Sequence, residues 1–180
     1  DLLYLHDATS GKLYRANANT LELTLFADNI VDYAAYGNDA LLYVTAKDAP
    51  EGMVTARLLK GSETITLKNI HADTVYLLEL AKLGNALVMG IGSPAEGRVV
   101  VYNDPINALK KNDFATTPVP TTVLRVENPQ TLTISADSSA ILSCSGQKCA
   151  SHEFEEDRTY VFDIEKTVTS PLDINWMDGQ

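Results

Sequence analysis

One short apolar segment recurs four times along the chain, and this repetition limits the possible fold more than any other feature. The copies begin at Leu2, Leu41, Leu87 and Ile141, and each of the last three follows a polar turn. Each copy is followed by a loop and then by a second run rich in β-branched residues, which favour strands. A period of about 40 to 50 residues with four short strands per period is typical of β-propeller blades.

The physical basis of this prediction is the burial of apolar surface. One four-stranded sheet hides little apolar area alone, whereas sheets stacked face to face cover each other and leave only short edges. The sequence therefore predicts an all-β fold of about four four-stranded antiparallel sheets, either part of a larger propeller or a dimerising half. The expected repeats span approximately residues 1–36, 37–80, 81–135 and 136–176, with a further repeat starting within 174–180.

Three segments depart from simple alternation. Tyr76–Lys82 also fits a helical turn, but its position in the repeat favours a strand. Asn103–Pro120 contains three prolines and predicts a surface insertion, with a short helical turn at Ile106–Lys111. We expect Ser145–Asp157 to form a long polar loop, followed by strands at Arg158–Ile164 and Val168–Ser170.

The last seven residues carry a family resemblance. Ile174–Gln180 (INWMDGQ) resembles the opening of WD-repeat-like blades in bacterial propellers, such as the Tol-system propeller and those attached to prolyl peptidases. Leu132–Ser139 is similar to it, with serine in place of glycine. The resemblance implies a propeller fold but no particular activity. The Gly-His and Trp-Asp signatures of eukaryotic WD repeats are missing.

The register of the repeats gives an expectation about the ends of the sequence. The chain would begin at the second strand of one blade and end at the first strand of another. Ile174–Trp176 would then pair with Leu2–Leu5 if four blades closed a ring. A piece of a larger propeller would instead leave an apolar blade face exposed, and two copies could join as a homodimer.

Charge and hydropathy exclude two classes of partner. The net charge of −10 argues against nucleic acid, whose phosphates need a basic surface, and against an anionic membrane face. No apolar run approaches the roughly 20 residues that a membrane helix needs. We therefore expect no nucleic-acid binding and no direct membrane insertion.

The two cysteines, Cys144 and Cys149, are separated by four residues. Their spacing suits a small disulfide, although two free thiols, a redox role or a metal site with His152 and Glu153 remain alternatives. A disulfide would imply an oxidising compartment. We therefore expect an exported protein, either extracellular or anchored at a membrane surface.

Motifs for catalysis are missing from the sequence. It contains no Gly-x-Ser-x-Gly, no phosphate-binding glycine loop and no calcium loop, and its three histidines are scattered. Aspartates such as Asp32, Asp39 and Asp137 fall at predicted turns, where they bond their own backbone. We therefore predict no catalytic residue, no metal ligand and no cofactor.

The function that remains is a non-enzymatic scaffold that binds a protein through its surface excursions. The acidic run Glu153–Asp157 would be a solvated loop or a partner contact. The candidate contact residues are Asn103, Lys110, Lys111, Phe114, Glu153, Phe154 and Glu155. The alternative is the regulatory, substrate-gating propeller of a hydrolase whose catalytic domain lies outside this sequence.

Overall fold

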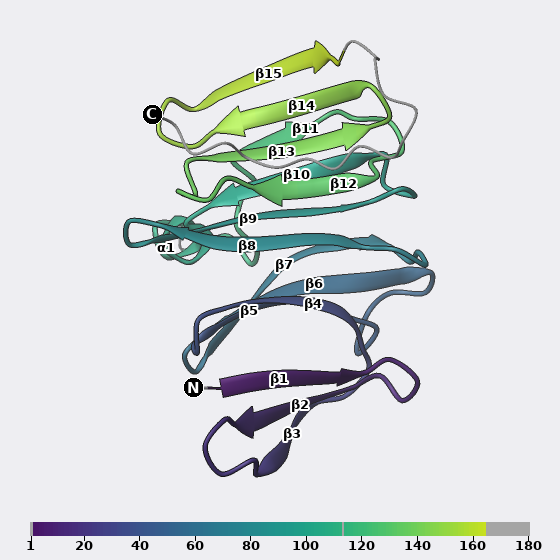
Figure 1. Ribbon diagram of the computed structural model, residues 1–180, viewed down its shortest axis with the longest axis vertical. Helices are drawn as coiled ribbons and strands as arrows, with labels where there is room; N and C mark the ends of the chain where they lie inside the picture. The colour runs from purple at the N-terminus through teal and green to yellow at the C-terminus, as the bar shows by residue number, and fades with distance from the viewer. Residues whose placement is uncertain (1, 113, 165–180) are drawn as a thin grey trace. The chain divides into compact units, whose positions relative to one another are not determined.

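A computed structural model describes residues 2–112 and 114–164 of the chain, which contain four antiparallel sheets and one short helix (Figure 1). The chain divides into two compact units. The first comprises Asp1–Thr74 with Pro105–Val119, and the second comprises Val75–Asp104 with Pro120–Gln180. Each unit contains two of the sheets.

The first unit has sheets of strand order β1-β2-β3 and β4-β5-β6-β7. Neighbouring strands are antiparallel and consecutive in sequence, so each sheet is a meander. Gly61, at a φ of 61°, makes the left-handed turn between β6 and β7, a conformation in which glycine costs least. The strands are β1 (Leu2–Asp7), β2 (Lys12–Asn17), β3 (Leu23–Ala27), β4 (Ile30–Tyr36), β5 (Ala40–Thr45), β6 (Met53–Lys60) and β7 (Glu63–His71).

The core of the first unit lies between its two sheets. Leu13 of β2 packs with Ile30, Leu41, Tyr43 and Leu59 of the second sheet. Burying each such side chain contributes roughly 1.5–3 kcal/mol. The two sheets are also joined by a hydrogen bond of 3.1 Å, which the Tyr33 hydroxyl donates to the Tyr4 carbonyl.

The second unit has sheets of order β11-β10-β9-β8 and β12-β13-β14-β15, again antiparallel meanders. The helix α1 (Pro105–Lys110) lies between β10 and β11 in sequence and belongs to the first unit. The strands are β8 (Leu77–Leu83), β9 (Ala86–Ser93), β10 (Arg98–Asn103), β11 (Thr122–Leu124), β12 (Thr131–Ile134), β13 (Ala140–Ser145), β14 (Lys148–Glu153) and β15 (Arg158–Asp163).

The core of the second unit also forms where two sheets stack. Its members from β9, β10 and β11 pack against members from β12, β13 and β14: Val88, Val99, Val101, Leu124, Leu132, Ile141 and Ala150. Gly90 of β9 lies where the two sheets pack against each other. A Cβ atom there would approach Ile141 Cδ1 to 2.5 Å and Leu132 Cδ2 to 3.0 Å. The missing side chain therefore allows the two sheets to approach closely.

The predicted all-β fold of blade-like antiparallel sheets is confirmed. Three copies of the recurring segment form β5, β9 and β13, which are buried along almost their whole length. The first copy forms β1, where half-buried and exposed residues alternate. Each four-stranded sheet begins with the strand that precedes the recurring segment, so the sheets are offset by one strand from the sequence repeats.

Two local predictions are confirmed and one is wrong. The segment Tyr76–Lys82 contributes to strand β8, and Ile106–Lys111 contains most of α1. Ser145–Asp157 is not a long loop, because it contains β14. Arg158–Ile164 consequently holds the fourth strand of its sheet rather than the third. The predicted strands at Val168–Ser170 and Ile174–Trp176 lie outside the described residues.

Candidate functional site

The insertion between β10 and β11 is closed at its base. The backbone N–H of Asn103 donates to the Thr121 hydroxyl at 2.8 Å, and the N–H of Thr121 donates to the Val101 carbonyl at 2.9 Å. The N–H of Asp104 donates to the Leu87 carbonyl at 2.8 Å. Asn103, a predicted contact residue, is half-buried and acts here through its backbone.

The body of the insertion is anchored by burial and by charge. Pro105 and Ile106 at the start of α1 are buried, which corrects the prediction of an insertion lying wholly at the surface. At the other end of α1, Lys110 Nζ lies 2.9 Å from Glu63 Oε2 of β7. Both charged groups are about half exposed, so the pair adds at most about 1 kcal/mol and mainly fixes the direction of the helix.

The tip of the insertion presents Lys111 and Phe114 to solvent. Phe114 is 98% exposed, the most exposed of the large apolar side chains in the described residues. A turn holds its backbone: the N–H of Phe114 donates to the Asn112 side chain at 3.4 Å and the N–H of Ala115 donates to the Asn112 carbonyl at 3.0 Å. Lys110, Lys111 and Phe114 therefore share one excursion.

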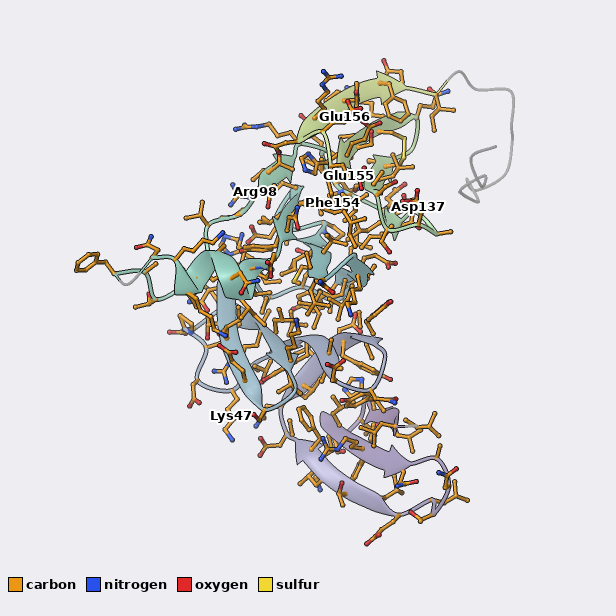
Figure 2. The ribbon with its side chains drawn as sticks, turned by 90° about the vertical axis from the view of Figure 1, so that its left-hand side faces the viewer. Lys47, Arg98, Asp137, Phe154, Glu155 and Glu156 are labelled. Carbon is orange, nitrogen blue, oxygen red and sulfur yellow. A yellow bond between two sulfur atoms is a disulfide. The ribbon has the colours of Figure 1, made fainter. Side chains whose placement is uncertain are left out.

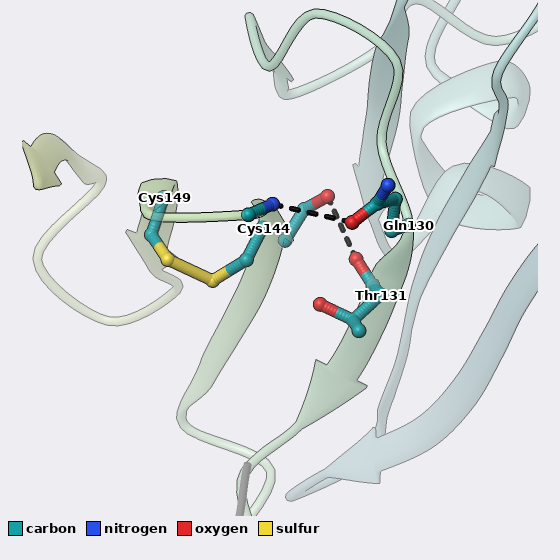
Figure 3. The surroundings of a disulfide bond; sticks show 6 residues. Gln130, Thr131, Cys144 and Cys149 are labelled. Carbon is teal, nitrogen blue, oxygen red and sulfur yellow. Dashed lines mark hydrogen bonds between the residues drawn. A yellow bond between two sulfur atoms is a disulfide. The ribbon is translucent and has the colours of Figure 1, made fainter. Parts of the chain in front are cut away.

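The cysteines lie on adjacent strands. Cys144 of β13 and Cys149 of β14 are register partners and form a disulfide (Figure 3). The connection between the strands is a two-residue turn at Gly146 and Gln147, and the N–H of Gly146 donates to Gln130 Oε1 at 3.2 Å. Both cysteines are buried beside Leu142. The disulfide thus joins two paired strands instead of stapling a long loop, and it leaves no thiolate for a metal.

The acidic run begins with the last residue of β14 and continues through the turn to β15 (Figure 2). Phe154 is only 5% exposed, packs in the core of the second unit, and donates its N–H to the Ser139 carbonyl at 2.8 Å. A partner cannot reach this ring, so Phe154 is removed from the candidate contact surface. Glu153 is half-buried at the end of β14, and Glu155 is exposed.

His152, on β14, is enclosed beside that turn. Its side chain is 1% exposed, and its ring meets Phe154 edge to face at 5.4 Å. Nδ1 shares a hydrogen bond of 3.1 Å with the Thr159 hydroxyl, while Nε2 lies 3.8 Å from Asp157 and has no hydrogen-bond partner. Burial lowers the pKa of His152, and the nearby Asp157 and Glu153 oppose that shift.

Asp137 illustrates the structural role expected for turn aspartates (Figure 2). Its carboxylate accepts from the Ser139 N–H at 3.0 Å and from the Ser135 and Ser139 hydroxyls at 2.7 and 2.8 Å. These hydrogen bonds lower the pKa of Asp137 to about 2. All three donors belong to its own turn.

The described residues contain no group of three or more His, Cys, Asp or Glu side chains that could hold a metal ion. Within the same residues, no helix is long and apolar enough to cross a membrane.

The first unit also contains a cavity of about 330 Å³ that the sequence pattern did not predict. Residues from the end of β3 and from β5 and β6 line it, including Phe26, Tyr43 and Arg57. The sequence did hold a signal, because Arg57 interrupts the otherwise apolar run Ala56-Arg57-Leu58-Leu59. A charge in the middle of a buried strand needs a local explanation.

No protein-family model and no curated protein matches the chain. Among solved structures it is similar to a chain of the mitotic checkpoint complex, at 11% identity and a TM-score of 0.49, over 89% of this chain and 47% of that one. It is also similar to a eukaryotic initiation factor, at 12% identity and a TM-score of 0.36, over 91% of this chain and 51% of that one.

A third similar structure is Hsv2 of Kluyveromyces lactis, at 8% identity and a TM-score of 0.30, over 90% of this chain and 60% of that one. The chain therefore spans about half of the length of the first two structures. The strand pairing within each sheet carries the fold assignment, and the contacts of this chain carry the functional argument.

Proposed function

We propose that the chain is a non-enzymatic scaffold that binds a protein partner through the insertion between β10 and β11. The single observation that carries this proposal is the placement of Phe114. A fully exposed phenylalanine costs solubility unless something covers it, and aromatic residues dominate the energetics of protein interfaces.

The anchoring of the insertion supports this role. Ordering a free loop on binding costs free energy that reduces affinity. Here the base is closed at Asn103 and Thr121, and Lys110 pairs with Glu63. Much of that ordering is present before any partner arrives.

Charge defines the partner's chemistry. Lys110 and Lys111 are adjacent cations on a chain of net charge −10, and Glu63 already pairs with Lys110. The complementary surface would hold an apolar pocket for Phe114 bordered by carboxylates near Lys111.

The test is photo-crosslinking from the insertion. A benzoylphenylalanine at position 114, and another at position 161 as an exposed control site on β15, would be irradiated in native extract. We expect one protein to crosslink selectively from position 114. The same protein would then be pulled down from extract with variants that carry no crosslinker. The amount recovered should fall by about tenfold or more with Phe114→Ala and remain unchanged with Val161→Ala. Equal capture by both variants would overturn the proposal.

We further propose that the protein works in an oxidising compartment outside the cytoplasm. The Cys144–Cys149 disulfide supports an exported or surface-anchored protein, because disulfides persist in oxidising compartments. Alkylation of the protein from its native source, with and without reduction, would test this. A mass increase of two alkyl groups before reduction would count against it.

We also propose that two copies of the chain associate. Leu3, Leu5, Leu23 and Leu25 are each about half exposed and lie in two cross-strand rows on one face of the sheet β1-β2-β3. Within each unit, such apolar faces are covered by another antiparallel sheet. A second copy of this chain would supply such a cover, giving a homodimer.

A further inference from the structure

The cavity of the first unit has apolar and polar lining in similar measure, and one of its polar side chains is an arginine on a buried strand. Its volume is about 330 Å³, at the lower end for small-molecule sites. Phe26, Ile30 and Tyr43 supply the apolar part of its wall, and the Phe26 and Tyr43 rings meet edge to face at 6.4 Å. Such a wall suits a compact aromatic or branched aliphatic body.

Arg57 is this arginine. It lies on β6 directly opposite Tyr43 of β5, between the buried residues Ala56 and Leu58. Its Nε is buried without a hydrogen-bond partner, and among the described residues Arg57 makes no ion pair with a carboxylate. A partly buried cation without a counter-charge is costly, so the cavity favours an anion.

The other polar groups of the wall already have partners. Lys47 Nζ lies 3.3 Å from Asp28 Oδ1, and the two charges offset each other. The Thr45 hydroxyl donates to the Asn29 carbonyl at 2.9 Å. The Arg57 guanidinium donates a hydrogen bond to the Tyr43 hydroxyl, but among the described residues no carboxylate pairs with its charge.

We propose that this cavity binds a small organic monoanion, a carboxylate with an aromatic or branched aliphatic body, through the Arg57 guanidinium. A single carboxylate matches one uncompensated charge, and the planar guanidinium matches its geometry. A phosphate dianion would place a second negative charge near Asp28 with nothing to offset it. The carboxylate could belong to a free acid or to the C-terminus of a peptide.

Chemical-shift titration of the intact chain tests this site. The probes are 3-phenylpropionate, the neutral 3-phenylpropionamide, and the peptide Gly-Gly-Phe with a free or an amidated C-terminus. We expect saturable shifts at β3, β5 and β6 with the acid, and binding of the amide weaker by about tenfold or more. Binding of the free-acid peptide would identify a chain terminus as the source, and its failure would identify a free acid.

Substitution of Arg57 provides a second test of the site. Arg57→Gln should weaken binding of 3-phenylpropionate by about tenfold or more, whereas Lys148→Gln, exposed on β14 and outside the cavity, should leave it unchanged. If Arg57→Gln does not fold, the acid and amide comparison on the unaltered chain still decides. Equal affinity for acid and amide, equal affinity of Arg57→Gln, or no saturable shift by about 10 mM would each overturn the proposal.

Discussion

Cys144 and Cys149 occupy directly opposed positions on β13 and β14, and their disulfide joins the two strands at a Cα–Cα distance of 4.1 Å. The sequence separation is five residues, so the bond removes little freedom from the unfolded chain. We predict that Cys144→Ala with Cys149→Ala lowers the free energy of unfolding by about 2 kcal/mol. Urea unfolding measures this, with the reduced chain as a second comparison. An unchanged midpoint in both would contradict the prediction.

Protonation of His152 should destabilise the fold. Its folded-state pKa is lowered, mainly by burial, so the unfolded chain binds the proton more readily. The stability from this group is present above its unfolded pKa of about 6.5 and is lost as the pH falls below that value. Thermal midpoints at pH 7.5 and 5.5 should therefore differ more for the unaltered chain than for His152→Gln. The same difference in both proteins would rule out His152 as the cause.

The close approach of two sheets at Gly90 predicts sensitivity to overpacking. Gly90→Val would force branched carbons against Ile141 and Leu132, and we expect a loss of about 1–3 kcal/mol in stability. Ala108→Val, on the exposed surface of α1, adds carbons without such neighbours and serves as the control. Chemical denaturation compares the two. A Gly90→Val protein as stable as the control would mean that the sheets are not packed this tightly.

Leu3 and Leu23 lie in one cross-strand row through Ala16, and they are 48% and 55% exposed. If two copies associate through this face, Leu3→Glu with Leu23→Glu should keep the chain monomeric, because like charges would meet across the interface. Sedimentation velocity over a range of concentrations measures this. Val161→Glu, on β15, is the matched control. A monomer at all concentrations before any substitution would refute the association.

Thr121 closes the base of the insertion by accepting from the Asn103 N–H. Thr121→Val keeps the shape of the side chain but removes the acceptor, at a cost of about 1 kcal/mol. We predict faster amide exchange at Lys111, Asn112 and Ala115, which hydrogen exchange with mass spectrometry can follow, and unchanged exchange in β13. Uniform acceleration over the whole chain would indicate general destabilisation instead.

The repeat predicted most of the fold because three of its copies, β5, β9 and β13, obtain their burial from aliphatic side chains. Strand β14 was not predicted, because its buried positions hold Cys149, Ala150 and His152 among polar neighbours. The serine, histidine and glutamate of that segment are typical of loops. The short spacing of the cysteines around Gly146 was the available signal, since a paired hairpin can place two such cysteines opposite each other.

The candidate sites were less predictable than the fold. The insertion was recognisable from its prolines, and its exposed Phe114 followed from its position there. Phe154 was wrongly predicted to be a contact residue, because the sequence of an acidic run does not show whether its one aromatic side chain faces the core or the solvent. The cavity at Arg57 depends on Phe26 and Tyr43, which are distant in sequence and meet only when their sheets stack.

The closed base of the insertion also bears on how such a chain could evolve. Asn103 and Thr121 hold the ends of the excursion together whatever lies between them. The entropic cost of closing a loop rises only slowly with its length, so the exposed residues of the tip, beyond the buried Pro105 and Ile106, can be exchanged or lengthened at little cost to the sheet. Binding specificity could diverge there by grafting, while the β-sheets that carry it stay the same.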